Sequence, residues 1–174
     1  MLTKNFYNYA MALFANKSIA NALVTPDGAV HSAYSVPNNG GYQRLFETLH
    51  NLRTNVSDAG VIIGIGTTPA TLDDIALESM IKGGFSYTYQ NSTIANKDEH
   101  GCYASATYQI TNTMSTDPLP ISEIGVLGKL FNSNGTNGFA YALLDRTVLE
   151  EPIIIPPGQT KQLTYTIRMN YPTA

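Results

Sequence analysis

The sequence predicts a mainly all-β protein, an antiparallel β-sandwich of the jelly-roll or Ig-like type with a short N-terminal helix. From residue 60 onward, short runs alternate apolar and polar residues, which is the pattern of half-buried strands. Turn signals rich in Gly, Pro and Asn separate these runs. No helical pattern alternates with them, so a parallel α/β sheet is not expected. Strands that each have one apolar face can bury it by packing sheet on sheet.

The composition suits one folded domain and argues against several classes of function. The chain has 174 residues, of which 43% are hydrophobic, so it can bury a core and is not disordered. Charged residues make up only 13%, about half the usual share, and no basic cluster is present, which argues against nucleic-acid binding. The single cysteine, Cys102, excludes an internal disulfide framework, and its strand-like surroundings predict a buried thiol.

The N-terminal stretch "MLTKNFYNYAMALFANKSIANA" does not have the pattern of a signal peptide. Asn5, Asn8, Asn16 and Lys17 interrupt the apolar run, whereas a signal peptide needs a continuous apolar core. No stretch of the chain approaches the roughly 18 apolar residues that a membrane span requires. We therefore expect a soluble, unprocessed protein with no membrane partner.

Residues 3 to 15 carry the best helical pattern, with Thr3 as a plausible N-cap. The apolar residues recur at offsets of three and four, so they share one face of the helix. In one interpretation this face packs on the domain body. In the other it docks into a partner subunit. The side chains that would dock are Phe6, Tyr9, Leu13 and Phe14.

A turn, a strand and a possible second helix follow. "TPDGA" has the Pro-Asp-Gly order of a tight turn, "AVHSAYSV" after it is an expected strand, and "PNNGG" ends that strand. Leu45, Leu49 and Leu52 recur at helical spacing and predict a short helix over residues 42 to 52. We assign residues 1–55 to an N-terminal helix and attachment segment, and residues 56–174 to the β-sandwich domain.

The remaining strands follow from alternation and bounding turns. In "CYASATYQITNT" the even-numbered residues are mostly apolar and the odd-numbered ones mostly polar, so one face of this strand is expected in the core. The closing segment is expected to be a hairpin around a Pro-Pro-Gly turn. The other expected strands lie in "GVIIGIG", "GGFSYTYQNSTI", "LPISEIGVLGKLF" and "GFAYALLDRTVL".

Two short motifs have a structural interpretation that is stronger than the chemical one. "GIGTTP" has a Gly-x-Gly after a strand, but a dinucleotide site needs a third glycine and a helix N-terminus, so we predict a tight turn where backbone segments approach. In "TLDDIALES", Thr71 and Asp74 have the spacing of a capping box for a short turn of helix.

The residue types of active sites do not group in this sequence. His31, His50 and His100 are far apart, and the "DEH" run that contains His100 is typical of a hairpin tip. No Gly-x-Ser-x-Gly elbow presents a nucleophile. Asp145 and Arg146 fall in mid-strand, where we expect their charges to pair across strands. We therefore assign no catalytic, cofactor-binding or metal-binding residues and expect that the protein is not an enzyme.

Three segments in order resemble a known family. They are "GIGTTPATLDDIALESMI", followed by two alternating strands, then "ISEIGVLG", and finally "LLDRTVLEEPIIIPPGQTKQLTYTIRM". This ordered set resembles a recurrent β-sandwich family of tailed-bacteriophage virion proteins. The resemblance covers roughly residues 60 to 170 and leaves the N-terminal segment outside.

The resemblance implies a structural component of a tailed-phage virion that assembles in the bacterial host cytoplasm. Head decoration or head-fibre subunits and neck or tail assembly proteins are the roles it suggests. The expected partners are other virion proteins and copies of the chain itself, with no cofactor. The alternative is a carbohydrate-binding module or adhesin of a phage receptor-binding apparatus, because the chain has 11 tyrosines and the polar loop "FNSNGTNGF".

Overall fold

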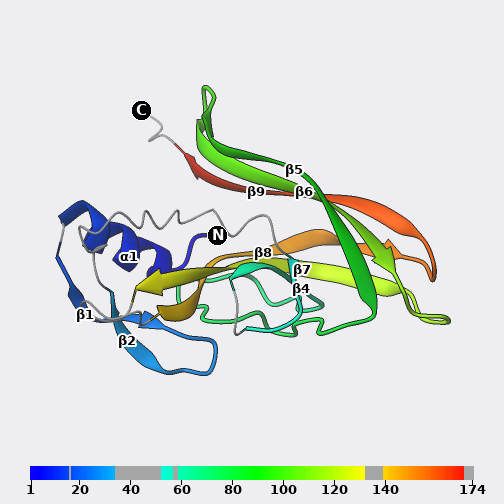
Figure 1. Ribbon diagram of the computed structural model, residues 1–174, viewed down its shortest axis with the longest axis horizontal. Coiled ribbons are helices and arrows are strands. Elements are labelled where there is room, and N and C mark those ends of the chain that lie inside the picture. The colour runs from blue at the N-terminus through cyan, green and yellow to red at the C-terminus, as the bar shows by residue number, and fades with distance from the viewer. Residues whose placement is uncertain (16, 34–51, 57–58, 132–138, 171–174) are drawn as a thin grey trace.

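The computed structural model describes residues 1–15, 17–33, 52–56, 59–131 and 139–170, and these form a mainly β, sandwich-like fold with a short N-terminal helix (Figure 1). This confirms the fold class that the sequence predicts. The elements are α1 (Lys4–Ala15), β1 (Ile19–Val24), β2 (Val30–Ala33), β3 (Leu52–Arg53), β4 (Gly60–Gly64), β5 (Phe85–Lys97), β6 (Gly101–Asn112), β7 (Leu119–Phe131), β8 (Phe139–Ile155) and β9 (Thr160–Asn170).

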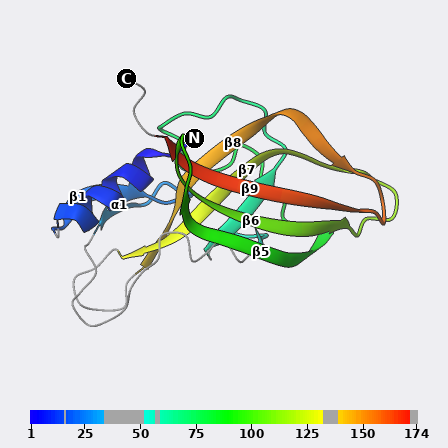
Figure 2. The same ribbon diagram turned by 90° about the horizontal axis from the view of Figure 1, so that it is seen from above.

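Two sheets form the sandwich, and a small hairpin accompanies them. The larger sheet has the strand order β3-β4-β7-β8 and is mixed, because β3 runs parallel to β4. The second sheet has the order β5-β6-β9 and is antiparallel. The hairpin β1-β2 lies beside α1 at one end of the molecule (Figures 1 and 2).

The main core lies between the two sheets, and period-two alternation fills it as the sequence predicts. The even-numbered residues of β6 from Ala104 to Ile110 are buried, whereas Gln109 is exposed and the odd-numbered residues before it are only half-buried. On β9, Leu163, Tyr165 and Ile167 are buried and the residues between them are exposed. The two strands therefore present one apolar face to the larger sheet.

β4 and β7 are buried on both faces, because the main core covers one face of the larger sheet and residues 65–84 cover the other. Val61 and Ile63 face the main core, while Ile62 joins a second small cluster with Leu77, Leu127 and Leu143. Residues 65–84 run across the outer side of this sheet and close that cluster (Figure 1). This double coverage explains why "GVIIGIG" is a continuous apolar run.

α1 packs on the domain body. Phe6 and Tyr9 are buried in the main core, and Leu13 is partly buried against it. The side chain of Phe14 lies outside the described residues. The same core cluster contains residues from both sides of the expected boundary at residue 55, so the helix shares its core with the sandwich.

The region around β1 differs from the expectation. The sequence pattern did not predict β1, which the side-chain amide of Asn5 holds by donating to the carbonyl of Val24 and accepting from its N–H. The "TPDGA" turn is confirmed, because the Gly28 N–H donates to the Thr25 carbonyl at 2.8 Å, and β2 confirms the strand after it as far as Ala33. The rest of that expected strand and the "PNNGG" that ends it lie outside the described residues. The helix expected over residues 42–52 lies outside the described residues except for Leu52, which belongs to β3.

The prediction of a closing hairpin is wrong. β8 pairs with β7 in the larger sheet, whereas β9 pairs with β6 in the other sheet. The Pro-Pro-Gly turn is therefore a corner that carries the chain from one sheet to the other (Figure 2). Gly158 has φ +68°, and its N–H donates to the backbone carbonyl of Asn112. The backbone N–H of Asn112 donates in turn to the carbonyl of Gln159. This local geometry suits a corner as well as a hairpin, so the turn residues alone could not distinguish them.

Substituting Gly158 tests the left-handed corner. We expect Gly158→Ala to lower the free energy of unfolding by about 1–2 kcal/mol, because an L side chain is strained at this φ even though the space around it is open. Gly83→Ala is the matched control, since that glycine also has open space but no positive φ. Urea denaturation of both variants measures the difference. Equal stabilities would contradict the prediction.

Candidate functional site

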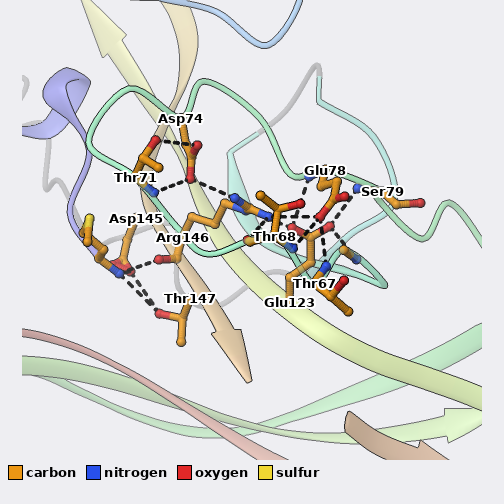
Figure 3. Close-up of polar contacts among 12 residues, drawn as sticks. Thr67, Thr68, Thr71, Asp74, Glu78, Ser79, Glu123, Asp145, Arg146 and Thr147 are labelled. Atoms are coloured by element: carbon orange, nitrogen blue, oxygen red, sulfur yellow. Dashed lines mark hydrogen bonds and ion pairs between the residues drawn. The ribbon is translucent and has the colours of Figure 1, made fainter. Parts of the chain in front are cut away.

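Among the described residues, a dense group of polar side chains lies on the outer side of the larger sheet, where the loop over residues 65–84 meets β7 and β8 (Figure 3). Glu123 on β7 and Arg146 on β8 occupy neighbouring antiparallel strands. Glu123 is opposite Val148, and Arg146 is opposite Gly125, so the two charges lie diagonally on one face. Glu123 is fully buried, and Arg146 is 3% exposed.

The two side chains form a direct ion pair. The Arg146 Nε donates to Glu123 Oε2 at 2.9 Å. One terminal nitrogen of the guanidinium donates to Asp74 Oδ2 at 2.9 Å, and the other donates to the Thr68 carbonyl at 3.1 Å. Arg146 therefore uses the fork of its guanidinium to join the sheet to two points of the loop over residues 65–84.

The carboxylate of Glu123 is saturated with donors. Besides Arg146, it accepts the backbone N–H groups of Gly66 at 3.0 Å, Glu78 at 3.1 Å and Ser79 at 2.7 Å. A buried carboxylate is costly unless it is paired and hydrogen-bonded, and here both conditions hold. Glu123 consequently fixes both ends of the covering loop to the sheet.

The two glycines of "GIGTTP" make room for this carboxylate. A Cβ on Gly64 would lie 2.5 Å from Glu123 Oε1, and a Cβ on Gly66 would lie 2.6 Å from the same atom. Real Cβ atoms do not approach that closely, so a larger residue at either position would displace Glu123. The prediction of a tight turn with close backbone approach is confirmed, and the side chain that needs the space is now identified.

Asp74 and Glu78 complete the cluster. Asp74 accepts from the N–H of Thr71 at 2.9 Å, which is one of the two contacts of a capping box, but the Thr71 hydroxyl donates to the same carboxylate at 2.9 Å, whereas in a capping box it accepts from a backbone N–H. No helix follows at this point, so the motif closes a turn instead. Glu78 accepts the N–H groups of Thr67 and Thr68 at 2.8 Å.

The contacts in the cluster shift the pKa values of Asp74, Glu78 and Arg146 toward their charged forms. Burial opposes ionisation of Asp74, but hydrogen bonds from Thr71 and Arg146 hold the pKa of this carboxyl below its ordinary value. Hydrogen bonds from Thr68 lower the pKa of Glu78 in the same direction. Burial opposes the charge of Arg146 as well, but Asp74 and Glu123 raise its pKa. The contacts of these three side chains therefore favour the charged form of each.

A second polar group surrounds Asp145, on the opposite side of β8. The buried hydroxyl of Tyr165 donates to Asp145 Oδ1 at 2.8 Å, and the amino group of Met1 forms an ion pair with Oδ2 at 3.1 Å. Burial and the neighbouring carboxylate raise the pKa of Tyr165 well above its ordinary value. Residues 1–3 also pair with the edge of β8, where the Thr3 N–H donates to the Leu144 carbonyl at 3.0 Å. Asp145 and Arg146 thus stabilise opposite faces of one strand.

The other candidate groups have local structural roles in this fold. Asp98 accepts the N–H groups of His100 and Gly101 at the tip between β5 and β6, which confirms the hairpin tip, and it binds Arg168 at 2.7 Å. Those bonds, first of all the one from Arg168, hold the pKa of Asp98 well below its usual range. Cys102 lies in β6 but is only half-buried, so the prediction of a buried thiol is wrong. Within the described ranges, no group of three or more His, Cys, Asp or Glu side chains is placed to hold a metal ion.

Two adjoining hollows lie beside the β1–β2 turn, with volumes of about 270 and 410 Å³. They share Pro26, Asp27 and Val56 as lining residues. The carboxylate of Asp27 accepts from the Thr25 hydroxyl and the Ala29 N–H, so it serves the turn. The carboxylate that lines both hollows is therefore part of the turn, and the ion pairs of Glu123 and Arg146 lie elsewhere in the fold.

Comparison with known proteins yields no relative. No protein-family model, curated protein or solved structure matches the chain significantly. In the part of the chain that the structure describes, no helix combines the length and the apolar character of a membrane crossing.

Removing the charge of Glu123 tests whether the cluster holds the fold. We expect Glu123→Gln to lower the free energy of unfolding by about 3–5 kcal/mol, because Arg146 would keep a buried charge with a weakened partner. Glu151→Gln on the exposed part of β8 is the matched control and should change stability by less than about 0.5 kcal/mol. Chemical denaturation of both variants gives the comparison. A loss at Glu123 no greater than at Glu151 would refute the stabilising role.

The same cluster predicts the direction of acid sensitivity. The ordinary pKa values are 3.8 for Asp74 and 4.5 for Glu78, and both are lowered in the folded state. Below these values the unfolded chain binds more protons than the folded chain, so the free energy of unfolding falls as the pH falls, until the native carboxyls protonate. Denaturation at a series of pH values from about 6 to about 2 should show this slope. Arg146→Met should make it shallower, and an unchanged slope in that variant would count against the assignment.

Proposed function

We propose that the chain is a non-enzymatic, multimeric structural component of a tailed-phage virion. The observation that supports this most is the convergence of the three phage-like segments on one buried ion-pair cluster. The glycines of the first segment, Glu123 of the second and Arg146 of the third form a single structural unit. The motifs that carry the family resemblance therefore act together in holding the fold.

The state of these side chains favours a structural role over a catalytic one. Glu123 and Arg146 are the sort of residues that active sites use, but their donors and acceptors are consumed within the chain. The loop above them is fixed to the sheet, and its contacts shift the pKa values of Asp74 and Arg146 toward the charged forms. A rigid block of this kind suits assembly by shape and surface complementarity.

Within a virion, we propose a role as a head decoration or head-fibre subunit or as a neck or tail assembly protein. Its partners would be other virion proteins and further copies of the chain. The sugar-binding alternative rests on the tyrosines, of which Tyr108 and Tyr165 are buried in the core and cannot stack on a ligand, whereas Tyr87 on β5 is exposed. The loop that suggested it lies largely outside the described residues, at 132–138.

Quantitative mass spectrometry of purified phage particles tests the proposal. Copies on the order of tens to hundreds per particle, scaled to the major capsid protein, would indicate the head, and about a dozen or fewer would indicate the neck or tail. Abundance in the lysate together with absence from purified particles would refute the structural role.

A further inference from the structure

β8 is an edge strand of the larger sheet. Among the described strands, β7 is the one that pairs with β8 along its length, so every second backbone N–H and C=O group of β8 points away from the sheet. An edge of this kind can pair with a strand of another molecule unless it is blunted or covered. How each half of β8 is protected therefore decides whether copies of the chain can meet through it.

The C-terminal half of β8 is blunted by its own residues. The pairing register shifts between Ile121 and Glu123 of β7, and β8 bulges at this point. Glu150, Glu151 and Pro152 lie in the bulge, and all three are exposed. Charged side chains, a proline and a bulge are the means by which natural proteins prevent pairing at an edge. This half of β8 is therefore protected without cover from another segment.

The middle of β8 is covered by residues 1–3 instead. The Thr3 N–H donates to the Leu144 carbonyl, and the Arg146 N–H donates to the Met1 carbonyl, both at 3.0 Å. The Met1 amino group also donates to the Arg146 carbonyl. The charged side chains in this part of β8 are buried on the two faces of the sheet, so they do not blunt its edge. Residues 1–3 thus occupy the backbone groups that an incoming strand would use.

We propose that residues 1–3 are a strap that closes the edge of β8, and that release of the strap lets β8 pair antiparallel with β8 of a second copy. Two identical strands can pair in this way about a two-fold axis, so the edge is its own partner. The device goes beyond the proposed virion role. Association is measured on the purified chain, so its outcome does not depend on whether the protein is found in particles.

Several contacts hold the strap in place. Leu2 supplies the apolar part, because it is 8% exposed and belongs to the main core. The Met1 amino group pairs with the Asp145 carboxylate at 3.1 Å, and the Thr3 hydroxyl donates to the Leu143 carbonyl. A substitution at Leu2 can therefore weaken the hold without altering β8 itself.

α1, which follows the strap, has anchors of its own. Phe6 and Tyr9 are buried in the main core. The side-chain amide of Asn5 bonds both the carbonyl and the N–H of Val24 on β1. In Figure 1 the N-terminus lies beside β8, beyond the start of the helix. The strap can therefore leave the edge while the helix stays in place.

Leu2→Asp tests the strap, because a carboxylate is not stable in the main core. We expect amide hydrogen exchange at Arg146, whose N–H donates to Met1, to become faster by about tenfold or more. Sedimentation velocity over a concentration series should show association at concentrations about tenfold or more below those that the unmodified chain needs. Leu2→Met keeps an apolar side chain of similar volume and should leave both measurements unchanged.

Val148→Pro tests whether the edge of β8 is the contact. The N–H of Arg146 points away from β7, and the register is regular from Asp145 to Val148, so the N–H of Val148 points the same way. A proline there removes an outward N–H and leaves the ladder with β7 intact. In the Leu2→Asp background it should return the association to that of the unmodified chain. A double variant that associates as strongly as Leu2→Asp would overturn the proposal.

Leu163→Ala separates release of the strap from loss of stability. Leu163 is 5% exposed in the main core on β9, so its truncation destabilises the fold and leaves the strap in place. Below its melting temperature this variant should associate no more than the unmodified chain. Equal association of Leu163→Ala and Leu2→Asp would contradict the proposal. So would a Leu2→Asp variant that associates no more strongly than Leu2→Met.

Discussion

The buried ion pair between Glu123 and Arg146 is the constraint on which the larger sheet depends. Removing two charges from water costs several kcal/mol for each ion, and only near-complete pairing offsets it. Glu123 meets this demand with three backbone N–H groups in addition to Arg146, and Arg146 meets it with Asp74 and the Thr68 carbonyl. Every one of those additional partners comes from residues 66–79, a stretch with little regular structure. The ion pair therefore orders a loop that could not order itself.

The need to pair the buried charges of Glu123 and Arg146 accounts for several features of the sequence that are far apart along the chain. Gly64 and Gly66 have no room for a side chain, because the Glu123 carboxylate, the Ser79 carbonyl and the Glu78 Cβ occupy the space. Asp74 and Thr71 form a turn that presents a carboxylate to Arg146. The loop, once fixed, brings Leu77 over Ile62 and closes the second apolar cluster. A polar network and a hydrophobic cluster thus stabilise the same face of the sheet, and each excludes water from the other.

Several elements could be predicted from the sequence because their signals are local. The alternation in β6 and β9 reports burial directly, and the helix over Lys4–Ala15 follows from its spacing of apolar residues. β1 could not be found this way, because it is held by side chains of α1 such as Asn5. The corner after Ile155 was misassigned for a related reason. A Pro-Pro-Gly turn specifies a reversal, but the sheet that receives the next strand is chosen by long-range pairing with β6.

The contacts of the polar cluster could be predicted from the sequence only in part. The mid-strand positions of Asp145 and Arg146 indicated pairing across strands, and this holds for Arg146, whose carboxylate partner is on β7. Asp145 instead binds Tyr165 of the other sheet and the first residue of the chain. Sequence alternation shows that neighbouring side chains on a strand point to opposite faces, but not which distant segment covers each face. The apolar pattern of α1 was likewise visible in the sequence, whereas the division into Phe6 and Tyr9 inside and Tyr7 and Met11 outside needed the fold.

The central claim is that Glu123, Arg146 and the loop over residues 65–84 form one stabilising unit, and a double-mutant cycle tests it most directly. Glu123→Gln, Arg146→Met and the double variant would be compared by the free energy of unfolding at neutral pH. The account predicts a favourable coupling energy of about 2–3 kcal/mol, since each side chain needs the other to offset its burial. A coupling energy below about 0.5 kcal/mol would mean that the two residues act independently, and it would contradict the account.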